Sequence, residues 1–273
     1  MGSYGTTPNP EVLPPDSRYE PAPEPERRRR WSSSWATYLL VGINCAVFLA
    51  MTAKRISPTS PTADQLLGFG ADSVSKVLFD GEWFRIVTAM FVHGGILHLA
   101  TNMWCLWNLG MLAEPLMSSS GVLVVYLLTG AAGNLLSILW SWYSYHDLGV
   151  YPASVGASGA VFGIAGALIV LLKSKLLPIP EAELKRLRKS VIYFAAINLV
   201  IGLSAQFGSR VTGINIDNSA HIGGFACGLL FAWPMVPRIG SPRDDFQFRL
   251  RCATGMVVGV LVLFGFFLAQ LGR

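Results

Sequence analysis

Few polar side chains interrupt the apolar segments of this chain, and those that do are of types that catalyse acyl transfer. His98 and Asn102 lie at the start of one apolar segment, Ser158 at the start of another, and His221 at the start of a third. Ionisable side chains are costly within apolar helices, so each indicates a functional site. A serine hydroxyl becomes a good nucleophile when a histidine takes its proton. Ser158 and His221 are therefore predicted to be nucleophile and base.

The tetrahedral intermediate of such a reaction needs hydrogen-bond donors for its oxyanion. The backbone amide of Ser158 is one predicted donor. The side chains of His98 and Asn102 are two others, because residues four apart share one face of a helix. One such donor is typically worth roughly 3–4 kcal/mol of barrier. The small neighbours Gly156 and Gly159 permit close approach of a substrate carbonyl to Ser158.

The orientation of the predicted base is a separate question. The only carboxylate within an apolar segment, Glu114, lies near the opposite end of its segment, where a buried hydrogen-bonding role is expected. Asp217, one helical turn before His221, is an alternative orienting group from the loop. The simpler prediction is a Ser–His dyad whose imidazole is held by packing. Phe162, four residues after Ser158, faces the same side and is expected to stack on His221.

A metal site formed by His93, His98 and His221 is another interpretation of the histidines. The spacing of His93 and His98 does not place both on one helix face, and no carboxylate is near enough to complete a ligand shell. The sequence therefore predicts no metal and no other cofactor. His146 is expected to be a solvated loop residue.

Composition places the chain among membrane proteins. Of its 273 residues, 52% are hydrophobic and only 14% are charged, with a mean hydropathy of +0.47. A soluble domain carries about 25% charged residues. The basic residues cluster beside apolar runs, which disfavours nucleic-acid binding despite the net charge of +5. The four cysteines have neither disulfide-type nor zinc-type spacing. An all-α polytopic membrane protein is predicted.

Seven apolar segments are each close to the roughly 20 residues that cross about 30 Å of hydrocarbon as a helix. They cover residues 35–53, 95–116, 121–143, 157–173, 190–207, 219–236 and 253–271. Residues 1–34, rich in Pro, Ser and charge, are predicted to be a disordered cytosolic tail without a signal or transit peptide. The long connection between the first two segments carries its own apolar residues, which indicates a functional or interfacial loop.

The distribution of basic residues predicts the orientation. With a cytosolic N-terminus, 15 of the 21 lysines and arginines lie on the cytosolic side. The positive-inside rule therefore favours this orientation, with the C-terminus outside. The second, fourth and sixth segments then all begin at the outer face. Their polar residues, from three separate helices, should meet at one depth in the membrane.

Glycine patterns predict which helices pack together. Small residues recur four apart at 159–163 and 224–228, a spacing that lets helix backbones approach closely in lipid. Close approach of these two helices would bring Ser158 within reach of His221. Three uncharged amides within the segments are expected to hydrogen-bond between helices: Asn108, Asn134 and Asn198.

Three motifs together resemble the rhomboid intramembrane serine proteases. They are HGGILHLATNMW (93–104), GASGAVFG (156–163) and AHIGG (220–224), in that order on the second, fourth and sixth segments. The resemblance covers about residues 35–236 and implies a six-span protease core over that range. It implies Ser158 as nucleophile and His221 as base. It also implies an oxyanion hole of His98, Asn102 and the Ser158 amide, with Gly224 as a close-packing glycine.

Other features of the chain fit this resemblance with small departures. The Trp83-x-Arg85 pair of the long loop is similar to the family pattern, but Phe84 stands where Trp is common. Phe162 stands where the stacking residue is often Tyr. The loop and seventh segment, 237–273, resemble the extra C-terminal helix of the "six plus one" arrangement.

The resemblance implies an intramembrane serine endopeptidase that cleaves transmembrane segments of single-span membrane proteins, most simply in the plasma membrane. The lipid bilayer and such substrates are the expected partners. The alternative is a non-catalytic rhomboid-like protein that binds membrane clients, but those relatives have usually lost the serine or histidine, and this chain has both. A transporter or channel is disfavoured because the ionisable residues cluster on one side only.

Overall fold

The computed structural model describes residues 34–149, 151–212 and 217–272, without the side chains of 201–212. Helices account for nearly all of the regular structure in these ranges. The predicted disordered tail lies outside the described residues, apart from Ser34. The all-α fold class is therefore confirmed for the part of the chain that the structure describes.

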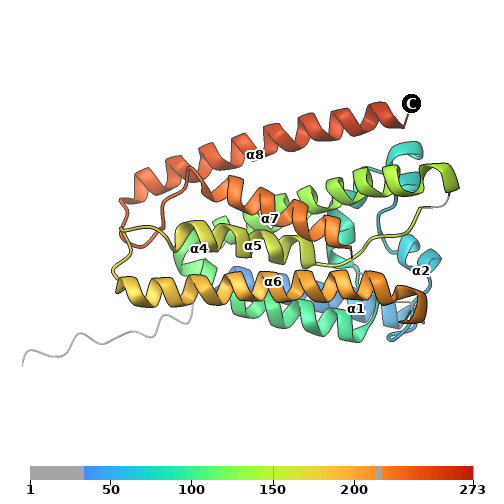
Figure 1. Ribbon diagram of the computed structural model, residues 1–273, viewed down its shortest axis with the longest axis horizontal. Helices are drawn as coiled ribbons and strands as arrows, with labels where there is room; N and C mark the ends of the chain where they lie inside the picture. Colours follow the sequence, from blue (N-terminus) through green and yellow to red (C-terminus); the bar gives the residue numbers. More distant parts are fainter. Residues whose placement is uncertain (1–33, 150, 213–216, 273) are drawn as a thin grey trace, which may run out of the picture. The chain divides into compact units, whose positions relative to one another are not determined.

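Figure 1 shows the helices in chain order. The long ones are α1 (Trp35–Ala53), α4 (Ile96–Tyr145), α5 (Ser158–Leu171), α6 (Glu181–Thr212), α7 (Asn218–Ala232) and α8 (Arg243–Leu271). Between α1 and α4 lie the short helices α2 (Ala63–Gly68), η2 (Ser75–Phe79), α3 (Arg85–Thr88) and η3 (Ala89–Phe91), and η4 (His146–Leu148) follows α4.

Helix α4 is two helices joined at a break. Ser118 has φ 64° and ψ 164°, which no α-helix contains, and Pro115 lies just before it. The Ser118 hydroxyl accepts a hydrogen bond from the Gly121 amide at 3.3 Å, so it caps the helix that follows. The two halves, 96–117 and 119–145, correspond to the second and third predicted apolar segments.

Among the residues that the structure describes, three helices are long and apolar enough to cross a membrane: α1, α4 (extended by η4) and α8. Helix α5 is a shorter apolar helix of 14 residues. Helix α8 presents large apolar side chains to its surroundings, with Leu263 71% and Phe266 66% exposed. A side chain of this kind is stable on the surface when the surroundings are lipid. The chain is therefore an integral membrane protein.

Helices α5 and α7 pack backbone against backbone (Figure 1). A Cβ atom at Gly224 would overlap the carbonyl oxygen of Gly159, and one at Gly228 would overlap that of Gly163. Neither contact leaves room for a methyl group. The close approach that the two glycine patterns predict is thus confirmed.

The connection between α1 and α4 is folded around one guanidinium group. Arg85 is buried and donates hydrogen bonds to the carbonyls of Leu67 at 2.6 Å and Ala71 at 2.7 Å, and its Nε lies 2.5 Å from the Glu82 carboxylate. The guanidinium group, whose donors have a fixed geometry, therefore links residues 67–71 of the connection to residues 82–85. Phe84, beside it, is 57% exposed, as an interfacial segment requires.

The amide side chains divide between two kinds of partner. Asn134 donates to the Ile86 carbonyl at 2.9 Å, which ties α4 to α3 as predicted. Asn108 and Asn198 instead donate to the carbonyls four residues earlier in their own helices, so the prediction of bonds between helices was wrong for these two. A helix offers every asparagine such a local acceptor, and the sequence does not reveal which acceptor is used.

Glu114 is buried, as predicted, and it caps the start of α1 from another helix. Its carboxylate accepts hydrogen bonds from the amides of Ala36 at 2.9 Å and Thr37 at 3.0 Å, and from the Thr37 hydroxyl at 2.6 Å. The first amides of a helix have no partner within the helix. The Glu114 carboxylate thus supplies the acceptor for two backbone amides and one hydroxyl that are buried in the protein.

We expect Glu114→Ala to lower the free energy of unfolding by about 3 kcal/mol or more, because it leaves three buried donors without an acceptor. Thermal unfolding of the purified protein in detergent measures this. Glu183→Ala, at an exposed position in the first turn of α6, is the control and should change stability by less than about 1 kcal/mol. Equal stability losses in the two variants would contradict the capping role.

Candidate active site

Ser158 is the first residue of α5 and is half-buried. Its own N–H therefore lies in the first turn, where an amide has no acceptor within the helix. Gly156, two residues earlier, has φ +118°, a region that favours glycine. A Cβ atom there would lie 2.7 Å from Cε1 and 2.8 Å from Nε2 of His98. The backbone before the predicted nucleophile thus touches the imidazole of a predicted oxyanion donor.

The hydrogen bonds around His98 determine which of its nitrogens carries the proton. The Gly94 amide donates to Nδ1 of His98 at 3.3 Å, so Nδ1 is an acceptor and the proton of the neutral ring is on Nε2. Nε2 faces the backbone at Gly156. Asn102 uses its Nδ2 to donate to the His98 carbonyl at 2.9 Å, and an amide group has a second proton to offer. The structure therefore places the side chains of His98 and Asn102 beside the backbone at Gly156, two residues before Ser158.

His221 lies in the first turn of α7 and is buried, at 6% exposure. Its ring stacks on that of Phe162, with centroids 4.4 Å apart and planes 9° from parallel. This confirms the predicted stacking contact. Nδ1 of His221 is buried and has no hydrogen-bond partner in the described part of the chain. Within the described residues, the imidazole packs against Phe162 and forms no hydrogen bond with a carboxylate.

The first turns of α5 and α7 are adjacent. A Cβ at Gly159 would lie 3.2 Å from the carbonyl oxygen of Ala220, so the residues after Ser158 and before His221 are in contact. Within the described residues the structure forms no hydrogen bond between the Ser158 hydroxyl and the imidazole. Catalytic hydrogen bonds are often long until a substrate is bound. The dyad therefore stays a prediction.

Asp217, the alternative orienting group, is engaged elsewhere. It is the N-cap of α7, and its side chain accepts a hydrogen bond from the Ala220 amide at 3.1 Å. It also accepts from the hydroxyls of Ser154 at 2.7 Å, Ser219 and Ser137. No described hydrogen bond joins this carboxylate to an imidazole nitrogen. The described bonds of Asp217 thus tie the start of α7 to serines of two neighbouring elements.

Sequence reasoning missed the polar cluster around Ser154. An isolated antiparallel bridge pairs Ser154 with Asp72, in the connection before α4, through two backbone hydrogen bonds of 3.1 and 2.9 Å. Neither segment has the alternating pattern of a strand. The one available signal was Asp217 directly before an apolar run, which is typical of a helix N-cap. Its partners Ser137 and Ser154 carry no comparable signal.

Asp72 is fully buried, and neither of its carboxylate oxygens has a hydrogen-bond partner among the described residues. Burial and then the Asp217 carboxylate raise the pKa of Asp72 well above its ordinary value, against an opposing effect of Arg85. The folded state therefore keeps this carboxyl protonated at pH values where the unfolded chain has ionised it. Its contribution to stability is complete below pH about 4 and decreases as the pH rises towards the folded-state pKa.

Asp72→Asn removes this ionisation, so we expect the variant to unfold at a higher temperature than the wild type at pH 8. The difference should shrink towards pH 5. Each unit of pKa shift corresponds to about 1.4 kcal/mol. Thermal unfolding at the two pH values measures it, with Asp80→Asn at an exposed carboxylate paired to Lys76 as the control. An equal difference in unfolding temperature at both pH values would show that the pKa of Asp72 is not raised in the folded protein.

The remaining histidines do not extend the site. The rings of His93 and His98 meet edge to face at 5.2 Å, because His93 precedes α4 instead of lying on it. Burial, with His98 nearby, lowers the pKa of His93 to about 3, so its ring is neutral. Among the described residues no three His, Cys, Asp or Glu side chains are grouped as metal ligands. His146 is exposed.

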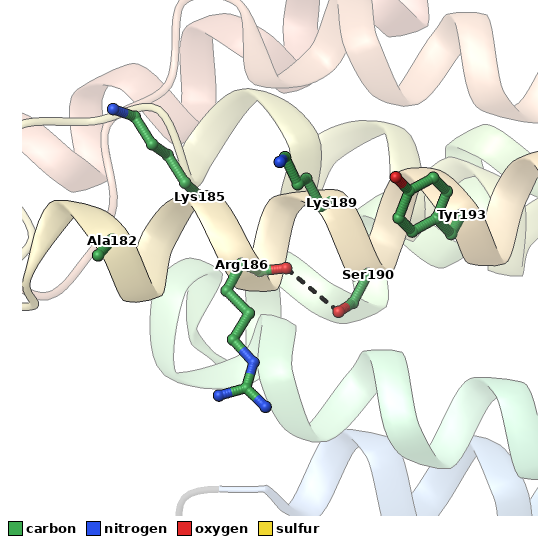
Figure 2. Close-up of a pocket in the computed structure, with 6 residues that line it drawn as sticks. All are labelled: Ala182, Lys185, Arg186, Lys189, Ser190 and Tyr193. Carbon is green, nitrogen blue, oxygen red and sulfur yellow. Dashed lines mark hydrogen bonds between the residues drawn. The ribbon is translucent and has the colours of Figure 1, made fainter.

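A separate hollow of about 350 Å³ lies on α6. Its lining includes the basic side chains of Lys185, Arg186 and Lys189. Figure 2 shows the two lysines pointing to one side of the helix and Arg186 to the other. Lys185 is moreover paired with Glu181 at 2.8 Å. The cations do not converge on one point, and the hollow contains none of the predicted site residues.

Comparisons with known proteins place this geometry in context. A family model described as "Rhomboid domain" matches residues 80–238. The chain is 32% identical over 206 residues to rhomboid protease GluP of Bacillus subtilis, covering 75% of this chain and 36% of the relative. It is 30% identical over 216 residues to rhomboid protease AarA of Providencia stuartii, covering 74% and 73%. A third relative is RHOMBOID-like protein 6, mitochondrial, of Arabidopsis thaliana, with 31% identity over 199 residues, 70% of this chain and 55% of that protein. The chain thus spans between about a third and three quarters of these relatives' lengths.

Proposed function

The chain belongs to the rhomboid family, and we propose that it is an intramembrane serine endopeptidase that cleaves transmembrane segments of single-span membrane proteins. The observation that carries the proposal is the convergence of three helices on one place. Gly156 puts the backbone before Ser158 against His98, and Phe162 stacks on His221. These contacts join the starts of α4, α5 and α7, where the catalytic side chains are predicted.

The mechanism follows from the chemistry of these groups. The Ser158 Oγ attacks the carbonyl carbon of the scissile peptide bond while His221 accepts its proton. The oxyanion accepts hydrogen bonds from the Ser158 amide, His98 Nε2 and Asn102 Nδ2. His221 then donates the proton to the leaving amine as the C–N bond breaks. A water molecule, deprotonated by His221, hydrolyses the acyl-enzyme and regenerates the serine.

For the topology, we propose six spans over residues 35–236 and a seventh in 237–273, with the N-terminus in the cytosol. The asymmetry of basic residues supports this orientation. It places the starts of α4, α5 and α7 near the outer face, where water for hydrolysis can enter. A location in the plasma membrane completes the proposal.

A non-catalytic protein that binds membrane clients is the alternative from another functional class. The presence of both Ser158 and His221, with His98 beside the backbone at Gly156, supports catalysis, because a client-binding protein needs neither a nucleophile nor a base. A binding protein should keep its interaction with membrane clients after the loss of Ser158 or His221.

Covalent labelling tests the proposed function. A fluorophosphonate probe should modify the wild type at Ser158, as located by peptide mass spectrometry, and the same preparation in liposomes should cleave a model single-span substrate. His221→Gln should reduce the labelling rate by about a hundredfold or more, because the hydroxyl loses its base. Ser190→Ala, on the face of α6 shown in Figure 2, is the control. Labelling that persists in His221→Gln would contradict the dyad.

A further inference from the structure

We infer that Asp217 is a positioning residue that joins the nucleophile's loop to the base's helix, a role that rests on the proposed function. Its carboxylate lies where three elements meet: the second half of α4, the segment before α5, and the start of α7. It contacts neither reacting side chain through a described hydrogen bond. Its effect on the reaction would therefore act through the placement of Ser158 and His221.

The two oxygens of Asp217 have different partners. Oδ1 accepts hydrogen bonds from the Ala220 amide at 3.1 Å and from the Ser219 hydroxyl, both within α7. Oδ2 accepts from the hydroxyls of Ser154 at 2.7 Å and Ser137. An N-cap needs only the first oxygen. The second oxygen is the one that links separate elements.

The spacing along the chain makes the link effective. Ser154 precedes Ser158 by four residues, and Asp217 precedes His221 by four residues. The bond between Ser154 and Asp217 therefore joins the two chain segments close to the predicted nucleophile and base. At 2.7 Å this bond is short, so it defines a fixed distance between the segments.

Other contacts hold the segment around Ser154 from further sides. Asp72 pairs with the Ser154 backbone, and the Gly156 amide donates to the Ala89 carbonyl at 3.0 Å. Ser137, which is buried, contributes the anchoring hydroxyl from α4. Because other contacts hold the backbone, the described role of the Ser154 side chain is its hydrogen bond to Asp217. Loss of that contact should change the alignment of the site more than it changes the fold.

Asp217→Asn is the sharpest test, because asparagine keeps one oxygen for the cap and replaces the oxygen that accepts from Ser154 and Ser137 by an NH₂ group that only donates. We expect kcat for a single-span substrate to fall about tenfold or more, with KM changed less than about twofold, since displacement of reacting groups acts mainly on the chemical step. Ser154→Ala should give a similar loss. Their combination should be no worse than Asp217→Asn alone, because the bond that Ser154→Ala removes is already lost in Asp217→Asn. Ser154→Thr, which retains a hydroxyl, should recover most of the activity.

Ser219→Ala is the matched control. It removes a hydrogen bond from the same carboxylate but leaves the link between elements, so its kcat should stay within about twofold of wild type. All rates are measured well below the unfolding temperature of each variant, and the fluorophosphonate labelling rate is recorded in parallel.

Wild-type kcat in Asp217→Asn, or losses from Asp217→Asn and Ser154→Ala that multiply, would overturn the positioning role while leaving the protease intact. A loss of activity that only follows the unfolded fraction would overturn it as well. If the wild type itself neither cleaves substrate nor reacts with the probe more than Ser158→Ala does, the proposed function fails, and the positioning role fails with it.

Discussion

Ser158→Ala is expected to reduce cleavage of a single-span substrate by at least about four orders of magnitude, because it removes the atom that forms the acyl-enzyme. Stability should hardly change. The Ser158 hydroxyl has no hydrogen-bond partner among the described residues, and the residue is half-buried, so alanine leaves no buried donor without an acceptor. The measurement is product formation in proteoliposomes, with thermal unfolding recorded on the same preparation.

The control for this variant is Ser190→Ala, which removes a hydroxyl that only bonds to the Arg186 carbonyl in its own helix, at 3.1 Å. It should cleave at the wild-type rate. Substantial product from Ser158→Ala, above that of a sample without protein, would refute Ser158 as the nucleophile. Full binding of a membrane client without any cleavage by the wild type would instead support the client-binding alternative.

Gly224→Ala is expected to have the largest effect on the fold. Its Cβ would overlap the carbonyl oxygen of Gly159, a backbone atom that no side-chain rotation can move away. Insertion of a methyl group into a packed core typically lowers the free energy of unfolding by about 1–3 kcal/mol. Because the neighbour here is rigid backbone, we expect a loss of about 3 kcal/mol or more. Helices α5 and α7 must separate, so cleavage should be lost together with stability.

Gly259→Ala is the matched control, because nothing lies within 4 Å of a Cβ built at this helical position of α8. It should leave cleavage unchanged and stabilise the helix by up to about 1 kcal/mol. Unfolding temperature and cleavage of both variants decide the matter. Wild-type stability in Gly224→Ala would mean that α5 and α7 are not held in the contact described here.

Much of this architecture could be predicted from the sequence because hydropathy and small-residue spacing are local signals. The apolar segments, the contact between α5 and α7, and the stacking of Phe162 on His221 follow from periods that one helix imposes on its own side chains. The early start of α6 at Glu181, rather than near 190, does not follow, since a span prediction reads apolarity and the first turns of α6 are charged.

The polar framework of the site was beyond prediction for a different reason. Asp72, Ser137 and Ser154 come from three separate parts of the chain, and nothing in their surrounding sequence says that they meet Asp217 or its partners. Such contacts depend on the tertiary arrangement alone. The break in α4 at Ser118 could not be predicted either, because a non-glycine residue at positive φ has no sequence signature of its own.

The glycine contact between α5 and α7 also limits how the molecule can move. With backbone already touching backbone, neither helix can slide towards or rotate against the other without a collision, so the two should behave as one rigid body. Any opening that admits a polypeptide must then be made by mobile parts surrounding this body. The pair carrying the nucleophile and the base would travel together and keep its alignment throughout a turnover.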